Sequence, residues 1–147
     1  MELVYILLVL LAGACAPTQA GINSQLSLWT HDPVLASLIS FAVGTVALAF
    51  LVFVLRIQWP PINTALGLPW WQWTGGFLGA FLVVVTVFLA PKLGAATMIA
   101  FFVAGQMFGS LLLDHFGWVG YDTHPVNVWR LAGAAFLITG VVMIEKF

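Results

Sequence analysis

The sequence predicts an all-α membrane protein with five transmembrane helices. Of its 147 residues, 63% are hydrophobic and only 6% are Asp, Glu, Lys or Arg, whereas about 25% of the residues in a soluble domain are charged. The apolar residues form continuous runs close to the roughly 20 residues that a helix needs to cross a bilayer. Because these runs do not alternate between polar and apolar residues, the strands of a membrane barrel are excluded.

Five apolar runs are the expected spans, and they form a single domain over residues 1–147. The runs are Leu3–Ala20, Val34–Leu55, Trp70–Ala90, Leu93–Leu113 and Val128–Ile144. All seven Trp residues fall in connectors or at the ends of runs, where an amphipathic ring sits at headgroup level. The ends of the runs therefore agree with the spans.

The first run has an alternative interpretation as a cleaved signal peptide, because small residues follow its apolar core. Secretory signals begin with a positively charged segment, but here the only charged side chain before the core is Glu2. We therefore expect this run to remain as a span. Within it, Pro17 lacks a backbone donor, which predicts a kink.

Four short connectors join the spans, and none is long enough to form a soluble module. They are Gly21–Pro33, Arg56–Pro69, Pro91–Lys92 and Asp114–Asn127. The third is so short that we expect the third and fourth spans to form a tight antiparallel hairpin, with Gly94 opening the fourth span.

Small residues recur at helical spacing in the last three spans. The pairs are Gly75 and Gly79, Gly105 and Gly109, and Gly133 and Gly140. Because helices in lipid associate through small residues, we expect these faces to pack against other helices. The alternative is that they let a solute approach the backbone.

Polar side chains form two stripes within the apolar sequence. Gln19 and Asn23 are four residues apart, and Gln106, Ser110 and Asp114 repeat that spacing in the fourth span. Amides and carboxylates facing lipid are costly, so both stripes should turn toward protein or water. They are either contacts between helices or the lining of a cavity, and two such stripes favour the cavity. Asp114 lies at a span end, so its alternatives are a solvated interfacial charge and a proton or counter-charge role.

Several function classes lack the residues that they require. No Asp, Glu or His lies near the middle of a span, so haem ligation in the membrane and proton exchange on a buried carboxylate are unsupported. The cluster Asp114, His115, Asp122 and His124 matches no strong zinc spacing. We therefore expect no enzyme activity, cofactor or metal, and no nucleic acid among the partners. Cys15 is the one cysteine, which excludes an internal disulfide.

The basic residues divide equally between the two sides of the membrane. Arg56 and Arg130 fall on the N-terminal side, and Lys92 and Lys146 fall on the other. An excess of Lys and Arg on one side normally sets orientation, so an equal count predicts insertion in both orientations unless it arose by chance. An inverted-repeat transporter needs two oppositely oriented halves. With five spans, the second half would be another copy of the chain.

Several stretches along the chain resemble the YdcZ-like proteins, a five-helix bacterial branch of the drug/metabolite transporter superfamily. The matching stretches are Gly13–Gln19 with Ile22–Asn23, Ser40–Thr45, Pro69–Trp71 with Gly75–Ala80, Gly94–Ala96, Gly105–Gln106, Ser110–Gly117, and Arg130, Gly133 and Gly140. Pro17 departs from the pattern. The resemblance implies two five-helix units related by a pseudo-two-fold axis in the membrane plane. It also implies a pathway lined by the first four helices, with the fifth as scaffold or dimer contact.

We therefore expect a transporter of a small polar or metabolite-like solute in the bacterial inner membrane. It would act by alternating access as an antiparallel homodimer, or with an oppositely oriented paralogue. The expected solute contacts are Gln19, Asn23, Gln106 and Ser110, with Trp70 or Trp71 gating an entrance. The alternative is a membrane accessory or assembly subunit that has a fixed orientation and transports nothing itself.

Overall fold

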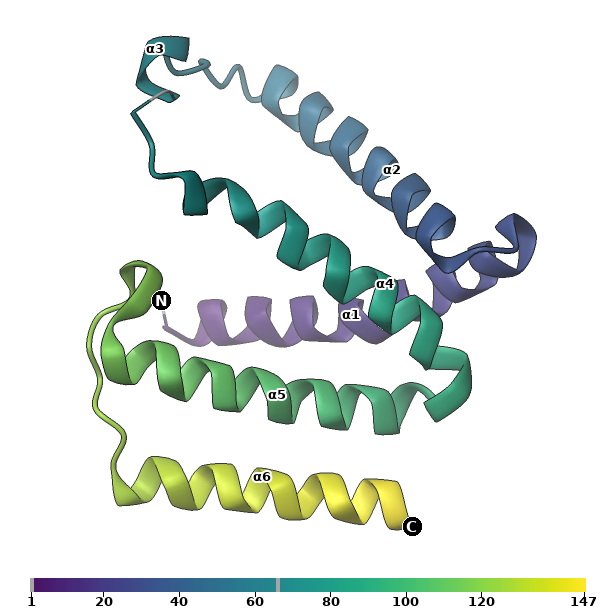
Figure 1. Ribbon diagram of the computed structural model, residues 1–147, viewed down its shortest axis with the longest axis vertical. Helices are drawn as coiled ribbons and strands as arrows, with labels where there is room; N and C mark the ends of the chain where they lie inside the picture. Colours follow the sequence, from purple (N-terminus) through teal and green to yellow (C-terminus); the bar gives the residue numbers. More distant parts are fainter. Residues whose placement is uncertain (1, 66) are drawn as a thin grey trace. The chain divides into compact units, whose positions relative to one another are not determined.

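The computed structural model describes residues 2–65 and 67–147, and in this part of the chain every regular element is helical (Figure 1). Five of its helical segments are long and apolar enough to cross a membrane, which confirms the all-α class and the five expected spans; the inverted dimer stays a prediction. They are α1 (Glu2–Thr30), α2 (Pro33–Val54), the 3₁₀ turn η1 (Trp70–Thr74) continued by α4 (Gly75–Leu93), α5 (Ala95–Phe116) and α6 (Val128–Lys146). The chain divides into two compact units, Met1–Pro91 (the N-terminal unit) and Lys92–Phe147 (the C-terminal unit).

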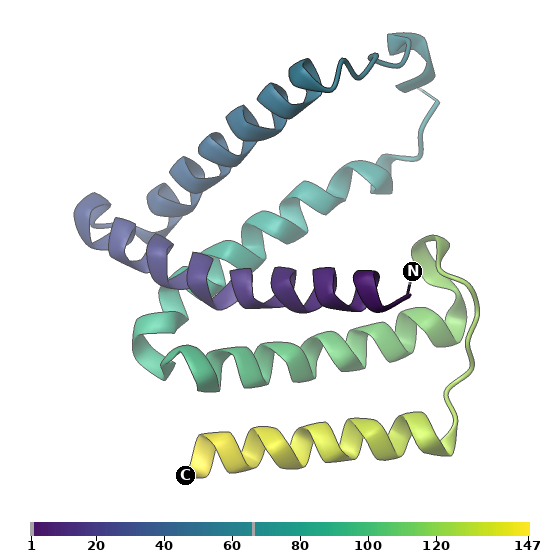
Figure 2. The same cartoon turned by 180° about the vertical axis from the view of Figure 1, so that it is seen from behind.

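Helix α1 is longer than the predicted span and absorbs most of the expected connector Gly21–Pro33. It has 29 residues, which is about 43 Å of helix against a hydrocarbon core of about 30 Å. Pro17 lies inside it. The ribbon changes direction along its length in both views (Figures 1 and 2), as is typical of a helix that contains a proline.

The hydroxyl groups near the end of α1 explain why the helix does not stop at Ala20. Ser24 Oγ donates to the Ala20 carbonyl at 2.8 Å, and Ser27 Oγ donates to the Ser24 carbonyl at 2.9 Å. Hydroxyls that bond back to their own helix need no water. A polar stretch that resembles a loop in the sequence therefore continues as helix.

A capped turn separates α1 from α2. The Asp32 carboxylate accepts a hydrogen bond from the Leu35 backbone N–H at 2.8 Å, and Pro33 occupies the first turn of α2. An acidic N-cap followed by proline satisfies an otherwise unpaired donor and pre-sets the helical φ. The start of α2 is thus fixed by local sequence.

The expected connector Pro91–Lys92 lies inside a helix, which corrects the prediction made from its proline. Helix α4 continues through Pro91 to Leu93, and Gly94, with a φ of 78°, separates it from α5. Proline has no N–H to offer the carbonyl four residues earlier, which is Val87. Ser24 Oγ donates to that carbonyl at 3.1 Å. The hydroxyl on α1 thus replaces the missing bond, as neighbouring helices do in membrane proteins. The expected hairpin of the third and fourth spans stays a prediction.

The same region holds the core of the N-terminal unit. Ala36, Val83 and Val87 form a buried cluster from α2 and α4, and Leu26 of α1 packs against it. A short helix, α3 (Ile62–Ala65), lies in the connector between α2 and η1.

In the C-terminal unit, α5 and α6 run side by side in opposite directions (Figures 1 and 2). Helix α5 ends at Gly117, whose φ of 63° is left-handed, and the short turn η2 (Trp118–Gly120) follows. Helix α6 begins after Asn127, whose side-chain oxygen accepts from the Arg130 N–H at 2.9 Å. The bounds of the last two spans thus follow local end signals.

Candidate functional site

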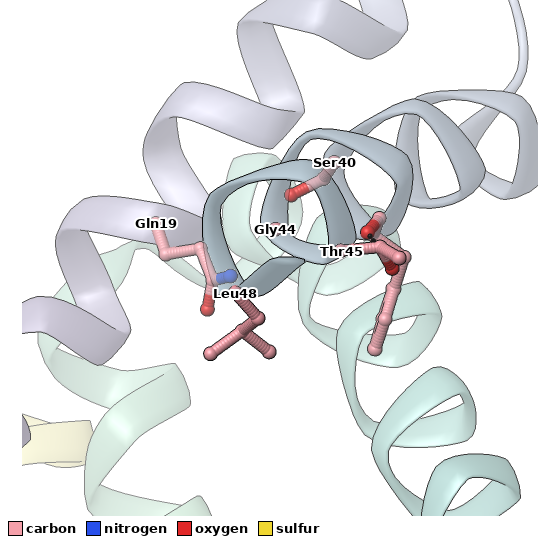
Figure 3. A pocket seen from close by; sticks show the side chains of 6 residues that line it. Gln19, Ser40, Gly44, Thr45 and Leu48 are labelled. Carbon is pink, nitrogen blue, oxygen red and sulfur yellow. Dashed lines mark hydrogen bonds between the residues drawn. The ribbon is translucent and has the colours of Figure 1, made fainter. Parts of the chain in front are cut away.

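Two cavities lie along α1 and α2 and share two residues. The larger, of about 490 Å³, is lined mainly by α1, and the smaller, of about 210 Å³, mainly by α2. Gln19 and Ser40 line both. We call the pair of cavities the polar groove. In Figure 3, the Gln19 side chain reaches from α1 toward Leu48 of α2. Helix α2 also carries Ser40, Gly44 and Thr45.

Helical spacing brings the residues of the polar groove together. Gln19 and Asn23 are four residues apart on α1, and both line the larger cavity. Ser40, Gly44 and Leu48 repeat the interval on α2 and line the smaller cavity. Residues four apart lie one above the other on a helix. The two helices therefore present facing stripes, one of which the sequence analysis identified.

Asn23 is the exceptional polar residue of the N-terminal unit. Its exposed fraction is 3%, and no atom of the described residues accepts a hydrogen bond from its Nδ2. Ser24 and Ser37 are also buried, but the single proton of Ser24 Oγ is shared between two carbonyls and Ser37 Oγ donates to the Pro33 carbonyl at 2.7 Å. Because buried polar groups are nearly always paired, the unpaired donor of Asn23 suggests that a partner joins it from outside the chain.

The lining of the polar groove carries no charge. Apart from its amides and hydroxyls and the Cys15 thiol, its side chains are apolar: Leu11, Ala14, Ile22, Phe41 and Leu48. An unpaired ion entering such a site would lose its hydration without compensation. The site is therefore suited to an uncharged group that forms hydrogen bonds.

A second polar site lies between α5 and α6 in the C-terminal unit. A cavity of about 370 Å³ there is lined by Ser110, Asp114, Arg130 and Gly133, among others. The Arg130 guanidinium and the Asp114 carboxylate form an ion pair at 3.1 Å, with side chains 33% and 30% exposed. Asp114 is therefore neither isolated nor fully solvated, in contrast to the simple interfacial charge considered from the sequence.

The connector between α5 and α6 ties this ion pair into a network. The guanidinium also donates to the His124 carbonyl at 3.1 Å, and the His124 N–H donates to the Asp114 carbonyl at 2.7 Å. Two residues after His124, the Val126 N–H donates to His115 Nδ1 at 3.1 Å. These bonds join the end of α5 to the start of α6, so the polar groups here have structural partners.

The other predicted solute contacts lie elsewhere. Gln106 is exposed on α5 and does not line the cavity that contains Ser110. Trp70 and Trp71 lie in η1, are 78% and 41% exposed, and line neither cavity of the polar groove. Their assigned roles stay predictions.

The predicted glycine faces differ in what they meet. A Cβ added at Gly79 would lie 3.6 Å from the Phe41 ring, so this glycine faces α2 at ordinary contact distance. No described atom of the same unit lies within 4 Å of a Cβ at the others: Gly75, Gly105, Gly109, Gly133 and Gly140. Their packing role also stays a prediction.

Two residues of these sites were not identified from the sequence. Ser40 was quoted only within a motif, although its four-residue spacing to Gly44 is a signal for a small, polar face. Arg130 was counted only among the basic residues on the N-terminal side of the membrane, although Asp114 ends one span and Arg130 starts the next. Opposite charges at the joined ends of consecutive antiparallel helices are close enough to pair. Among the described residues, no group of three His, Cys, Asp or Glu could hold a metal ion.

Comparisons with known proteins identify the family of this chain. Residues 4–143 match the family described as "Putative inner membrane exporter, YdcZ". The chain is 34% identical over 77 residues to the inner membrane protein YdcZ of Escherichia coli (strain K12). That alignment includes 52% of this chain and 51% of the relative, so the chain spans about half the length of the curated relative it matches. No solved structure matches the chain.

Proposed function

The chain belongs to the YdcZ family, and from that premise we propose that it exports a small, uncharged polar or metabolite-like solute as a dual-topology transporter. Its family and its five span-length helices make it a multi-pass protein of the inner membrane. The family description supports the direction of transport. The solute and the assembly are the parts that we add.

The polar groove is the observation that carries this proposal. A membrane helix has little reason to bury an amide such as Asn23 beside a cavity unless the amide packs or binds something. Gln19 and Ser40 add hydrogen-bonding groups that belong to both cavities. Small-molecule sites are mostly apolar with a few placed polar groups, and the groove has that composition.

The transporter works as an antiparallel homodimer, or with an oppositely oriented paralogue. Support comes from the equal division of Arg56 and Arg130 against Lys92 and Lys146, which gives little electrostatic preference for either orientation. Two copies of opposite orientation create the pseudo-two-fold axis that alternating access uses. In this assembly Gln106 and Ser110 also contact solute, Trp70 or Trp71 gates an entrance, and Asp114 has the proton or counter-charge role.

Reporters fused after Phe147 test the orientation. One reporter is active only in the cytoplasm and the other only in the periplasm, and each is measured in intact cells. Comparable signals from both fusions are expected. Signal from one fusion alone would rule out the self-inverted dimer and favour a paralogue partner or the accessory subunit.

Metabolite release tests the transport itself. Cells making the wild-type protein should release at least one small uncharged metabolite faster than cells making Gln19→Leu. Gln58→Leu is the matched control, because Gln58 is exposed in the connector after α2 and lines neither cavity. Equal release from wild-type and Gln19→Leu cells, with equal protein levels, argues against the groove as the pathway.

A further inference from the structure

Resting on the proposed function, we propose that Asn23 selects the solute, and that the solute is an uncharged amphipathic molecule with a hydrogen-bond-accepting oxygen beside an apolar body. Three features of the polar groove lead to this class: an unpaired donor, an uncharged lining and a limited volume.

The unpaired donor defines the polar end of the solute. Asn23 Nδ2 is buried and lacks an acceptor among the described residues, and leaving such a group unpaired is costly. Asn23 already lines the larger cavity, so a ligand there can reach the donor once the side chain rotates. The ligand atom must accept a hydrogen bond, as the oxygen of an amide, ketone or ester does.

The lining defines the rest of the solute. Leu11, Ala14 and Ile22 surround the larger cavity on α1, and they favour a hydrocarbon portion over a second polar group. A cationic or anionic solute finds no charged side chain in either cavity. The larger cavity, at about 490 Å³, lies within the range of roughly 300–1,000 Å³ that small-molecule sites occupy.

A lipid chain is the main competing occupant of this cavity. The hydrocarbon tail of a lipid fills apolar space equally well, but the tail has no acceptor for the Asn23 amide. A second copy of the chain is the other competitor, and its packing would make the amide a structural contact. Both alternatives predict that an acceptor-bearing molecule gains nothing from Asn23.

Cys15 supplies the measurement, because it is the chain's one cysteine, is exposed, and lines the same cavity. The rate of its modification by N-ethylmaleimide is measured on protein in liposomes. The probes are N,N-diethylbutanamide, which has an acceptor oxygen and no donor, and N,N-diethylbutylamine, which has the same carbon skeleton but is a cation at neutral pH. Only the amide should slow the modification in a saturable way.

Variants then assign the effect to Asn23. In Asn23→Leu, the amide should bind about 2- to 10-fold more weakly, which is the loss expected for one hydrogen bond. Thr86→Val is the matched control. Thr86 lies on α4 and lines neither cavity of the polar groove, and its hydroxyl already donates to the Val83 carbonyl at 2.9 Å, so affinity should not change. Asn23→Ala serves as a second variant, and a shift in unfolding temperature caused by the same probes gives a readout without the thiol.

The outcomes separate this inference from the proposed function. Equal protection by amide and amine, or unchanged affinity in both Asn23 variants, would overturn the assigned solute class even if metabolite release depends on the groove. Selective, Asn23-dependent binding of the amide supports the class even if the cells release no metabolite. In that case it is the transport proposal that fails.

Discussion

In the N-terminal unit, the Asn23 amide is buried beside a cavity without an acceptor among the described residues, whereas in the C-terminal unit the Arg130 guanidinium bonds to both Asp114 and the His124 carbonyl. Both are polar groups beside cavities in an apolar chain. A paired group mainly holds its own structure together, and an unpaired one leaves capacity for a ligand. A polar group beside a cavity that lacks a hydrogen-bond partner is therefore a better indicator of ligand binding than the number of polar residues near the cavity.

The largest expected loss of stability comes from breaking the network of Arg130, Asp114 and His124, which we call the paired site. Arg130→Met removes both bonds of the guanidinium and leaves Asp114 without its cation, so the free energy of unfolding should fall by about 1.5–3 kcal/mol. Denaturation of the detergent-purified protein by a titration with SDS measures this change. Arg56→Met is the matched control and should change little, because Arg56 is exposed. If the two variants lose equal stability, the network does not hold the ends of α5 and α6 together.

The unpaired site should respond in the opposite direction. Asn23→Leu removes a buried donor that has no acceptor, and without solute it should raise the free energy of unfolding by about 1–3 kcal/mol. The neighbouring substitution Ser24→Ala should lower it, because Ser24 Oγ donates to the Ala20 and Val87 carbonyls. The same SDS titration compares them. A loss of stability in Asn23→Leu would mean that the amide has a structural partner in the assembled protein, and the contrast between the two units would disappear.

A glycine at the end of α5 tests how tightly the paired site is built. Gly117 has a φ of 63°, and a Cβ there would lie 2.6 Å from Thr123 Oγ1. Left-handed backbone alone costs a residue with a Cβ about 1–2 kcal/mol, so Gly117→Ala should destabilise the protein by at least that amount. Gly120→Ala is the control, since Gly120 has a φ of 91° but open space around it. Equal melting temperatures of the two variants would show that Thr123 moves aside freely.

Removing a helix cap should have the smallest effect on stability, and comparing one cap from each unit shows whether the two units respond equally. Asp32 accepts from the Leu35 N–H and Asn127 accepts from the Arg130 N–H, at 2.8 and 2.9 Å. Asp32→Ala and Asn127→Ala should each cost about 1 kcal/mol. Thermal unfolding in one detergent measures both. A much larger loss in one variant would show that the units differ in overall stability and not only in how their polar groups are paired.

Hydropathy was sufficient to predict five helices because each apolar run is continuous. Asn127 before α6 and Gly117 after α5 are recognisable caps in the sequence. The end of α1 and the interior of α4 were not predictable in this way. Pro91 indicates a break when considered alone, but α4 continues because Ser24 Oγ donates to the Val87 carbonyl. Helix α1 continues because the Ser24 and Ser27 hydroxyls bond back to their own helix.

The candidate sites were predictable only along single helices. The four-residue interval of Gln19 and Asn23 indicated one wall of the groove, and Ser110 with Asp114 indicated one wall of the second cavity. The facing residues, Ser40 and Arg130, lie on other helices. Periodicity within one span carries no information about which span lies beside it, so these partners became apparent only in three dimensions.

Pro17 in α1 leaves a carbonyl without the replacement bond that is found beside Pro91 in α4. Proline cannot donate to the carbonyl four residues earlier, which here is Gly13, and no side chain among the described residues donates to that oxygen, whereas Ser24 serves the Val87 carbonyl. In hydrocarbon such an acceptor needs a donor from a neighbouring helix, from a water molecule or from a local adjustment of the helix itself. We expect the bend of α1 to be the point of the first span where a polar group from outside the helix is most readily admitted into the bilayer.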